Sequence, residues 1–162
     1  MKTVNKEEFE STCQLFIAAV HKYFSHLQQV TKEAMPPSET GVPYVKDKDT
    51  VALKDCTGMI GISGNRKGFV YISGDKALYK DLIKIFVRRD DPSDDHILDM
   101  AGEVSNVVSG NVRESYGKDF MISVPLVFEG QPKNVKFPDN VPVFVIPISW
   151  KNHEAFVVIG LE

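Results

Sequence analysis

The chain has 162 residues, a formal net charge of −3 at pH 7 and an isoelectric point of about 5.8. This mildly acidic balance gives no long-range attraction to nucleic acid or to an anionic membrane, and no apolar run approaches the ~20 residues of a membrane-spanning helix. The length fits one domain with a full core, so we expect residues 1–162 to form a single domain. The charged N-terminus lacks the apolar stretch of a secretory signal, and we therefore expect a cytoplasmic protein.

The N-terminal part predicts a long amphipathic helix over residues 5–32. Its apolar residues recur at three- and four-residue spacing, which places them on one side of a helix. They are Phe9, Cys13, Phe16, Ile17, Val20, Tyr23, Phe24 and Leu27. The stretch 36–41 contains two prolines and a glycine and predicts a loop. Residues 42–51 are expected to be extended but irregular, because Pro43 and a run of alternating Lys and Asp disfavour a central strand.

Residues 57–63 and 68–73 predict a β-hairpin. Both runs are rich in residues that favour strands, and the segment between them includes Gly64 and Asn65, which favour a turn. A second helix is expected from Lys76 to about Val87, because apolar residues again recur at helical spacing.

A third helix is predicted from Ser93 to about Tyr116. Ser93 is the expected N-cap, and Asp94 and Asp95 suit the positive end of the helix dipole. Gly117 is the expected end of the helix, because glycine is the usual residue just beyond a helix C-terminus.

This third helix has an apolar face and a polar face. With about 3.6 residues per turn, the apolar residues between Ile97 and Val112 fall on one side of it. The opposite side carries Asp99, Glu103, Asn106, Gly110 and Arg113, with Gly102 at its margin. Glu103 and Asn106 stand three residues apart, so their side chains are neighbours.

The two glycines of the third helix need an explanation. Glycine inside a helix costs about 1 kcal/mol relative to alanine, and Gly102 and Gly110 bracket the Glu103 and Asn106 pair. A solvated face would not need them. The pattern indicates that the backbone of another molecule comes close to this face.

The remainder of the chain is strand-like. A run over residues 120–128 is interrupted by Pro125, residues 129–132 form a turn, and a second hairpin joins 143–150 to 154–161. Residues 155–161 are apolar on both faces, so this strand is either central in the sheet or covered by a partner. The order of elements predicts an α+β domain, or a two-layer α/β one, with long helices on a largely antiparallel sheet.

Several kinds of chemistry lack their sequence signals. There is no GxxxxGK(S/T) motif, and the glycines of residues 58–64 lie within a hairpin rather than between a strand and a helix, which disfavours nucleotide binding. The four histidines lack metal-ligand spacing and the basic residues are scattered, so we expect neither a metal site nor a nucleic-acid partner. Cys13 and Cys56 belong to no CxxC motif, which predicts two buried free thiols.

The glycine-rich hairpin followed by the polar helix resembles the CheX branch of the CheC/CheX/FliY chemotaxis phosphatases. The helix part reads D-x-x-G-E-x-x-N-x-x-x-G-N over residues 99–111. The hairpin part is carried by Gly58, Gly61, Gly64 and Gly68. The resemblance spans roughly residues 9–161, and the chain has one such helix, as CheX does, where CheC-like members have two. The family also has a proline downstream of the asparagine, for which Pro125 is the candidate here.

The resemblance implies a CheC/CheX-like fold and hydrolysis of the aspartyl phosphate of a CheY-like response regulator. Asn106 would orient the attacking water, and Glu103 would engage a lysine of the partner's pocket. The Mg²⁺ would belong to the regulator, so no cofactor is expected in this chain. The expected partner-contacting residues are Asp99, Gly102, Gly110 and Arg113. Asn111 lies toward the core edge of the helix and is expected to bond backbone groups rather than substrate.

Two other functions are compatible with such a fold. A non-catalytic adaptor or sensor domain could bind a regulator without hydrolysing its phosphate, but it would have no chemical need for both Glu103 and Asn106. A small-molecule-binding domain has no support beyond the fold. The family resemblance further implies a homodimer made by joining the sheets of two copies, for which the doubly apolar strand 155–161 is suitable.

Overall fold

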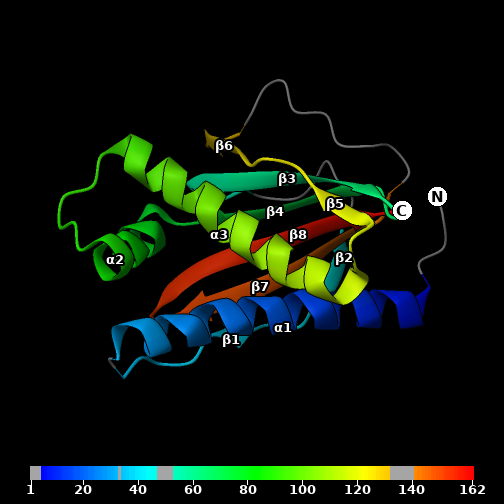
Figure 1. Ribbon diagram of the computed structural model, residues 1–162, viewed down its shortest axis with the longest axis horizontal. Helices are drawn as coiled ribbons and strands as arrows, with labels where there is room; N and C mark the ends of the chain where they lie inside the picture. Colours follow the sequence, from blue (N-terminus) through cyan, green and yellow to red (C-terminus); the bar gives the residue numbers. More distant parts are fainter. Residues whose placement is uncertain (1–4, 33, 47–52, 132–140) are drawn as a thin grey trace.

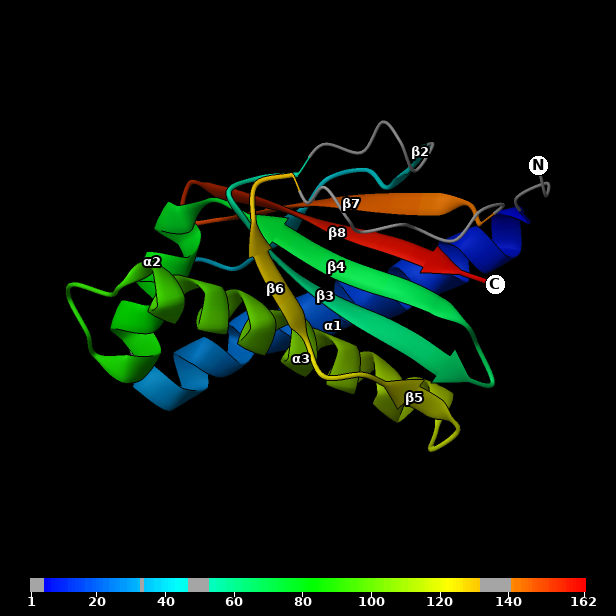
Figure 2. The same cartoon turned by 90° about the horizontal axis from the view of Figure 1, so that it is seen from above.

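The computed structural model describes residues 5–32, 34–46, 53–131 and 141–162. These residues form two layers, with three helices packed on one face of an antiparallel sheet (Figure 1, Figure 2). The helices are α1 (Lys6–Thr31), α2 (Lys76–Val87) and α3 (Asp94–Tyr116). The strands are β1 (Glu39–Thr40), β2 (Tyr44–Lys46), β3 (Cys56–Gly64), β4 (Gly68–Gly74), β5 (Phe120–Ile122), β6 (Leu126–Glu129), β7 (Val143–Trp150) and β8 (His153–Leu161). The predicted α+β class, with long helices on an antiparallel sheet, is confirmed.

Polar caps set the ends of the two long helices. The Asn5 side chain accepts hydrogen bonds from two backbone N–H groups in the first turn of α1. At the start of α3, the Ser93 hydroxyl accepts from the backbone N–H of His96, and the His96 ring accepts from the backbone N–H of Ser93. Gly117 ends α3 with a φ of 92°. The predicted ends of both helices therefore agree with the structure to within a residue.

Strand β8 lies inside the sheet. The strand order is β1-β7-β8-β4-β3-β5, with β2 also paired to β7 and β6 also paired to β3. β8 is hydrogen-bonded to β7 along one edge and to β4 along the other, and Val157, Val158 and Ile159 are buried. Of the two alternatives for this apolar strand, the central position is the correct one. It has no free edge, so β8 cannot itself join the sheets of two copies, contrary to the expectation from its apolar faces.

Two short strands extend the β7 side of the sheet. The predicted 36–41 loop contains β1, because Glu39 and Thr40 pair with β7. The expected extended stretch 42–51 supplies β2 at Tyr44–Lys46, and its part from residue 47 onward lies outside the described residues.

The remaining turns follow the prediction closely. Pro125 separates β5 from β6, and both of these strands pair with β3. The expected 129–132 turn is described only as far as residue 131. In the second hairpin, Lys151 and Asn152 have φ values of 48° and 64°, which suit a two-residue turn, so β8 begins at His153.

Helix α3 is held against β3 by a close backbone approach. A β-carbon at Gly58 would overlap the backbone carbonyl oxygen of Ala101, so the missing side chain lets the helix reach the strand. One turn further along, the Ser105 hydroxyl donates a hydrogen bond of 2.9 Å to the carbonyl oxygen of Gly58. Together these contacts determine which side of α3 faces the sheet, and hence which side faces away from it.

The larger of two clusters of buried apolar side chains fills the space between the sheet and the helices, and the smaller one is made by strand residues such as Tyr71 and Val158. Phe16 of α1, Tyr79 of α2 and Ile97 of α3 are among the largest fully buried side chains of the larger cluster. Among the described residues, no helix combines the length and the apolar character needed to cross a lipid bilayer.

Candidate functional site

The polar face of α3 points away from the sheet. Glu103 and Asn106 are both exposed, whereas Ala101, Val104 and Val108 of the same helix are buried. The 3.6-residue period of the helix separates the two sets, and the contacts around Gly58 fix its rotation. A carboxylate and a carboxamide therefore stand next to each other, about one turn apart, on a rigid support. Asp99 and Arg113 are exposed as well.

Gly102 faces this chain rather than a partner. It is buried, and a β-carbon there would lie 2.9 Å from the Val127 side chain and 3.4 Å from that of Pro125. The missing side chain thus lets the Pro125–Val127 segment pack on α3, which corrects the expectation that Gly102 admits the backbone of another molecule. Gly110 differs, because a β-carbon there would meet nothing within 4 Å. Of the two glycines, Gly110 alone borders open space.

Two hollows flank the outer side of α3. One, of about 290 Å³, lies between α2 and α3; it is called the α2–α3 hollow and includes Asp99 and Glu103. Its other lining residues are Ile83, Val87, Arg89, His96 and Met100. The second, of about 380 Å³, lies between α1 and α3 and is called the α1–α3 hollow. Its lining residues are Lys22, Tyr23, Ser25, His26, Gln29, Val107 and Asn111.

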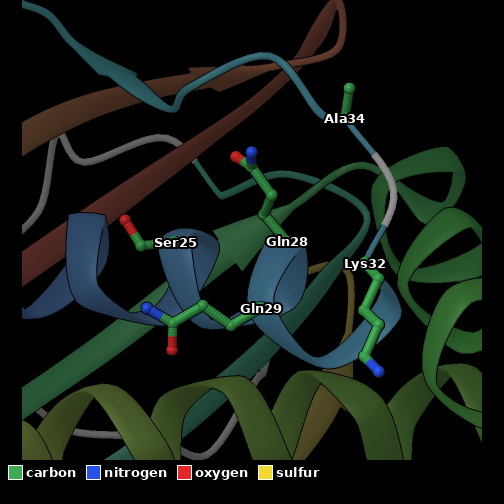
Figure 3. A pocket seen from close by; sticks show the side chains of 5 residues that line it. All are labelled: Ser25, Gln28, Gln29, Lys32 and Ala34. Atoms are coloured by element: carbon green, nitrogen blue, oxygen red, sulfur yellow. The ribbon is translucent and has the colours of Figure 1, made fainter.

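The α1–α3 hollow continues along the end of α1. A third hollow, of about 610 Å³, lies there. Figure 3 shows the polar side chains that line it, which are Ser25, Gln28 and Gln29 from the last turns of α1 and Lys32 from just beyond its end. Ser25 and Gln29 line both hollows. The surface between α1 and α3 is therefore indented next to Val107, the residue that follows Asn106.

Asn111 stabilises the packing of α3 on α1. Its side-chain amide donates a hydrogen bond of 3.4 Å to the backbone carbonyl oxygen of Ala19. This confirms that Asn111 bonds a backbone group. Nearby, Lys22 and Glu114 form an exposed ion pair of 2.9 Å between the same two helices, which contributes little to stability.

Neither cysteine is a nucleophile for this site. Both Cys13 and Cys56 are buried and free, as predicted. Burial raises the pKa of each thiol to about 11, so both are protonated near neutral pH and unreactive. In the parts of the chain that the structure describes, no three His, Cys, Asp or Glu side chains are grouped as metal ligands.

A family comparison identifies the group to which the sequence belongs. The model of the family described as "Chemotaxis phosphatase CheX" matches residues 56–149, more than half of the chain. The chain belongs to the CheX family. The matched region includes β3, β4, α2, α3 and most of β7, and thus both Glu103 and Asn106. The predicted family membership is confirmed. No curated protein matches the sequence.

Solved structures resemble the chain over nearly its whole length. A chemotaxis protein from Desulfovibrio vulgaris Hildenborough is 28% identical with a TM-score of 0.75, covering 99% of this chain and 100% of that one. CheX from Desulfovibrio desulfuricans is 27% identical with a TM-score of 0.73, covering 92% and 97%. CheX from Borrelia burgdorferi, solved in complex with CheY, BeF₃ and Mg²⁺, is 18% identical with a TM-score of 0.67, covering 93% and 97%. At that identity the last likeness shows the fold.

The residues that surround Glu103 in the α2–α3 hollow could not be recognised from the sequence. Arg89 and Val87 line the α2–α3 hollow with Glu103 only because the end of α2 packs beside α3. The Arg88–Arg89 pair is visible in the sequence, but its position relative to Glu103 depends on the angle between two helices. No local sequence pattern predicts the angle between these two helices.

Proposed function

We propose that this protein hydrolyses the aspartyl phosphate of a CheY-like response regulator. The observation that carries the proposal is the exposed pair of Glu103 and Asn106 on one face of a helix whose opposite face is locked to the sheet. Membership of the CheX family supports the reaction class. The Borrelia burgdorferi structure of CheX with CheY supports the kind of partner.

The substrate is reactive enough that a site with two polar side chains can catalyse its hydrolysis. An aspartyl phosphate is an activated acyl phosphate, so a water that attacks phosphorus in line displaces a carboxylate and forms inorganic phosphate. Catalysis of such transfers depends mainly on positioning and electrostatics. The carboxamide of Asn106 can accept from and donate to that water without adding a charge that would repel the phosphoryl group.

Glu103 has a different role in the proposal. A carboxylate close to the phosphoryl oxygens would be repelled by them, which makes Glu103 a poor general base. We assign it instead to an ion pair with a lysine of the regulator, which would hold Asn106 at the reacting centre. The Mg²⁺ that neutralises the phosphoryl oxygens would be bound by the regulator, and this chain would contribute no cofactor. Asp99, Gly110 and Arg113 would complete the contact surface.

The proposal includes a cytoplasmic homodimer. Because β8 is interior, we assign the joining of two sheets to outer strands of the described sheet, such as β5 and β6. That end of the sheet exposes Met121, Val124 and Leu126, of which Val124 is 86% exposed, and covering such residues would favour association. Light scattering should give twice the 18.1 kDa mass of the chain. A monomeric mass would refute the dimer.

One assay separates the phosphatase from the adaptor alternative. A CheY-like receiver protein from the same organism is charged with acetyl phosphate, and the release of inorganic phosphate is followed with and without this protein. The phosphatase proposal predicts that catalytic amounts accelerate release. Binding to the receiver without faster release would support the adaptor, and would refute the proposed activity.

A further inference from the structure

The hydroxyl group of Tyr23 is buried without a hydrogen-bond partner among the described residues. Its side chain lies on α1 and is only 4% exposed. Buried hydroxyls are nearly always paired, because an unpaired one loses its hydrogen bonds to water without replacement. Tyr79 on α2 shows the usual arrangement, since its hydroxyl lies 3.4 Å from the carbonyl oxygens of Cys56 and Ile72. The unused donor of Tyr23 therefore needs an explanation.

Tyr23 lies where α1 meets both α2 and α3. Its ring centroid is 6.2 Å from that of Phe86 on α2, and it lines the α1–α3 hollow together with Val107. Val107 follows Glu103 by four residues, so the two share one face of α3. Phe86 adjoins Val87, which lines the α2–α3 hollow with Glu103. Tyr23 thus packs against α2 and borders α3 on either side of the segment that carries Glu103.

The charge of Glu103 acts on the Tyr23 hydroxyl. Burial raises the pKa of Tyr23 above its ordinary value, and the negative charge of Glu103 raises it further. The same field that opposes ionisation of a phenol attracts its O–H proton. Tyr23 therefore remains a protonated donor throughout the physiological range, and its hydroxyl lies within the field of the Glu103 carboxylate.

We propose that Tyr23 is a positioning residue, whose hydroxyl donates a hydrogen bond to one carboxylate oxygen of Glu103 when the regulator docks. The inference rests on the proposed function, in which Glu103 pairs with a lysine of the regulator. An exposed glutamate samples several rotamers, and ordering it at an interface opposes binding. A donor anchored in the α1–α3 packing holds one carboxylate oxygen and leaves the other for the ammonium group of the partner.

The test compares Tyr23→Phe with Tyr79→Phe, which removes an equally buried hydroxyl of the same type. The kinetics of phosphate release are measured with the acetyl-phosphate-charged receiver. Tyr23→Phe should raise KM about fivefold, the effect of one net hydrogen bond, and leave kcat unchanged because Asn106 is intact. Its melting temperature should not fall, because the hydroxyl it loses is unpaired. Tyr79→Phe should melt at a lower temperature with unchanged kinetics.

A double-mutant cycle assigns the effect to Glu103. In a Glu103→Ala background, Tyr23→Phe should have no further effect on KM. A wild-type KM in Tyr23→Phe, or an equal increase in both backgrounds, would overturn the inference while leaving the proposed function intact. If the wild-type protein binds the BeF₃-loaded receiver without hydrolysis, the same cycle is run on Kd. If the wild-type protein neither hydrolyses nor binds, the proposed function fails first, and the inference fails with it.

Discussion

The two faces of α3 belong to one helix but are constrained in different ways. On the inner face, Ala101 approaches Gly58 too closely for any side chain at that position, and Ser105 donates a hydrogen bond to the same glycine. On the outer face, Glu103 and Asn106 are exposed. Packing therefore dictates the inner residues and leaves the outer ones free for chemistry. Inner-face changes should alter stability, and outer-face changes should alter activity.

The largest expected effect on stability is that of Gly58→Ala. The added β-carbon meets backbone and not a movable side chain, so α3 must shift, which should lower the free energy of unfolding by about 3 kcal/mol. Gly61→Ala on the same strand is the matched control, because its β-carbon would lie 3.5 Å from the Ser123 hydroxyl, an ordinary contact. Urea denaturation measures both variants. Equal stability of the two would contradict the close approach of α3 to β3.

Glu103→Gln tests the outer face. It keeps the shape of the side chain and removes its charge, so the proposed ion pair with the regulator is lost. We expect KM to rise about tenfold, equivalent to about 1.4 kcal/mol, while the free energy of unfolding changes by less than about 0.5 kcal/mol. Glu114→Gln, an exposed carboxylate further along α3, is the control and should leave KM unchanged. A fall in kcat with constant KM would instead assign Glu103 to the chemical step.

Ser105→Ala and Ser109→Ala form a matched pair on the inner face. Both hydroxyls are buried, but Ser105 bonds the Gly58 carbonyl oxygen whereas Ser109 has no partner among the described residues. Ser105→Ala should reduce the free energy of unfolding by about 1 kcal/mol, and Ser109→Ala should reduce it less or increase it. Thermal denaturation by calorimetry distinguishes them. The reverse order would show that the Ser105 bond does not hold the helix.

The smallest expected effect is that of thiol reagents at neutral pH. The pKa of Cys13 and of Cys56 is raised to about 11 from an ordinary 9.0, so Ellman's reagent should label neither thiol in the folded protein, and activity should persist. The unfolded chain releases these protons first as the pH rises, so stability should decline between pH 9 and about 11. Labelling after denaturation is the positive control. Rapid labelling of native protein would contradict the burial.

The helices and hairpins could be predicted because their signals are local. Asn5, Ser93 and Gly117 mark helix ends through contacts within one turn, and the 3.6-residue period separates the two faces of α3. The exposure of Glu103 and Asn106 followed from that period alone. The tight turns could be predicted as well, because their conformations depend on the residues within them.

Features that depend on distant packing could not be predicted. The pattern of β8 allowed either a central or a covered strand, and only its pairing with both β7 and β4 decides between them. Gly102 has the same local signal as Gly110, yet it packs against Pro125 and Val127 of the same chain. Tyr23 looks like any other apolar residue of α1, because its unpaired hydroxyl is apparent only in three dimensions.

The most direct test of the proposed function uses the Asn106→Ala variant. A receiver phosphorylated by acetyl phosphate is saturated with this variant, and its rate of dephosphorylation is measured. Because saturation removes any effect on binding, the rate reports only the positioning of the attacking water. We predict a loss of about 10²-fold or more, the scale of one lost transition-state contact, with unchanged affinity for the BeF₃-loaded receiver and unchanged thermal stability. A wild-type rate in this variant would contradict the central role of the carboxamide on the outer face of α3.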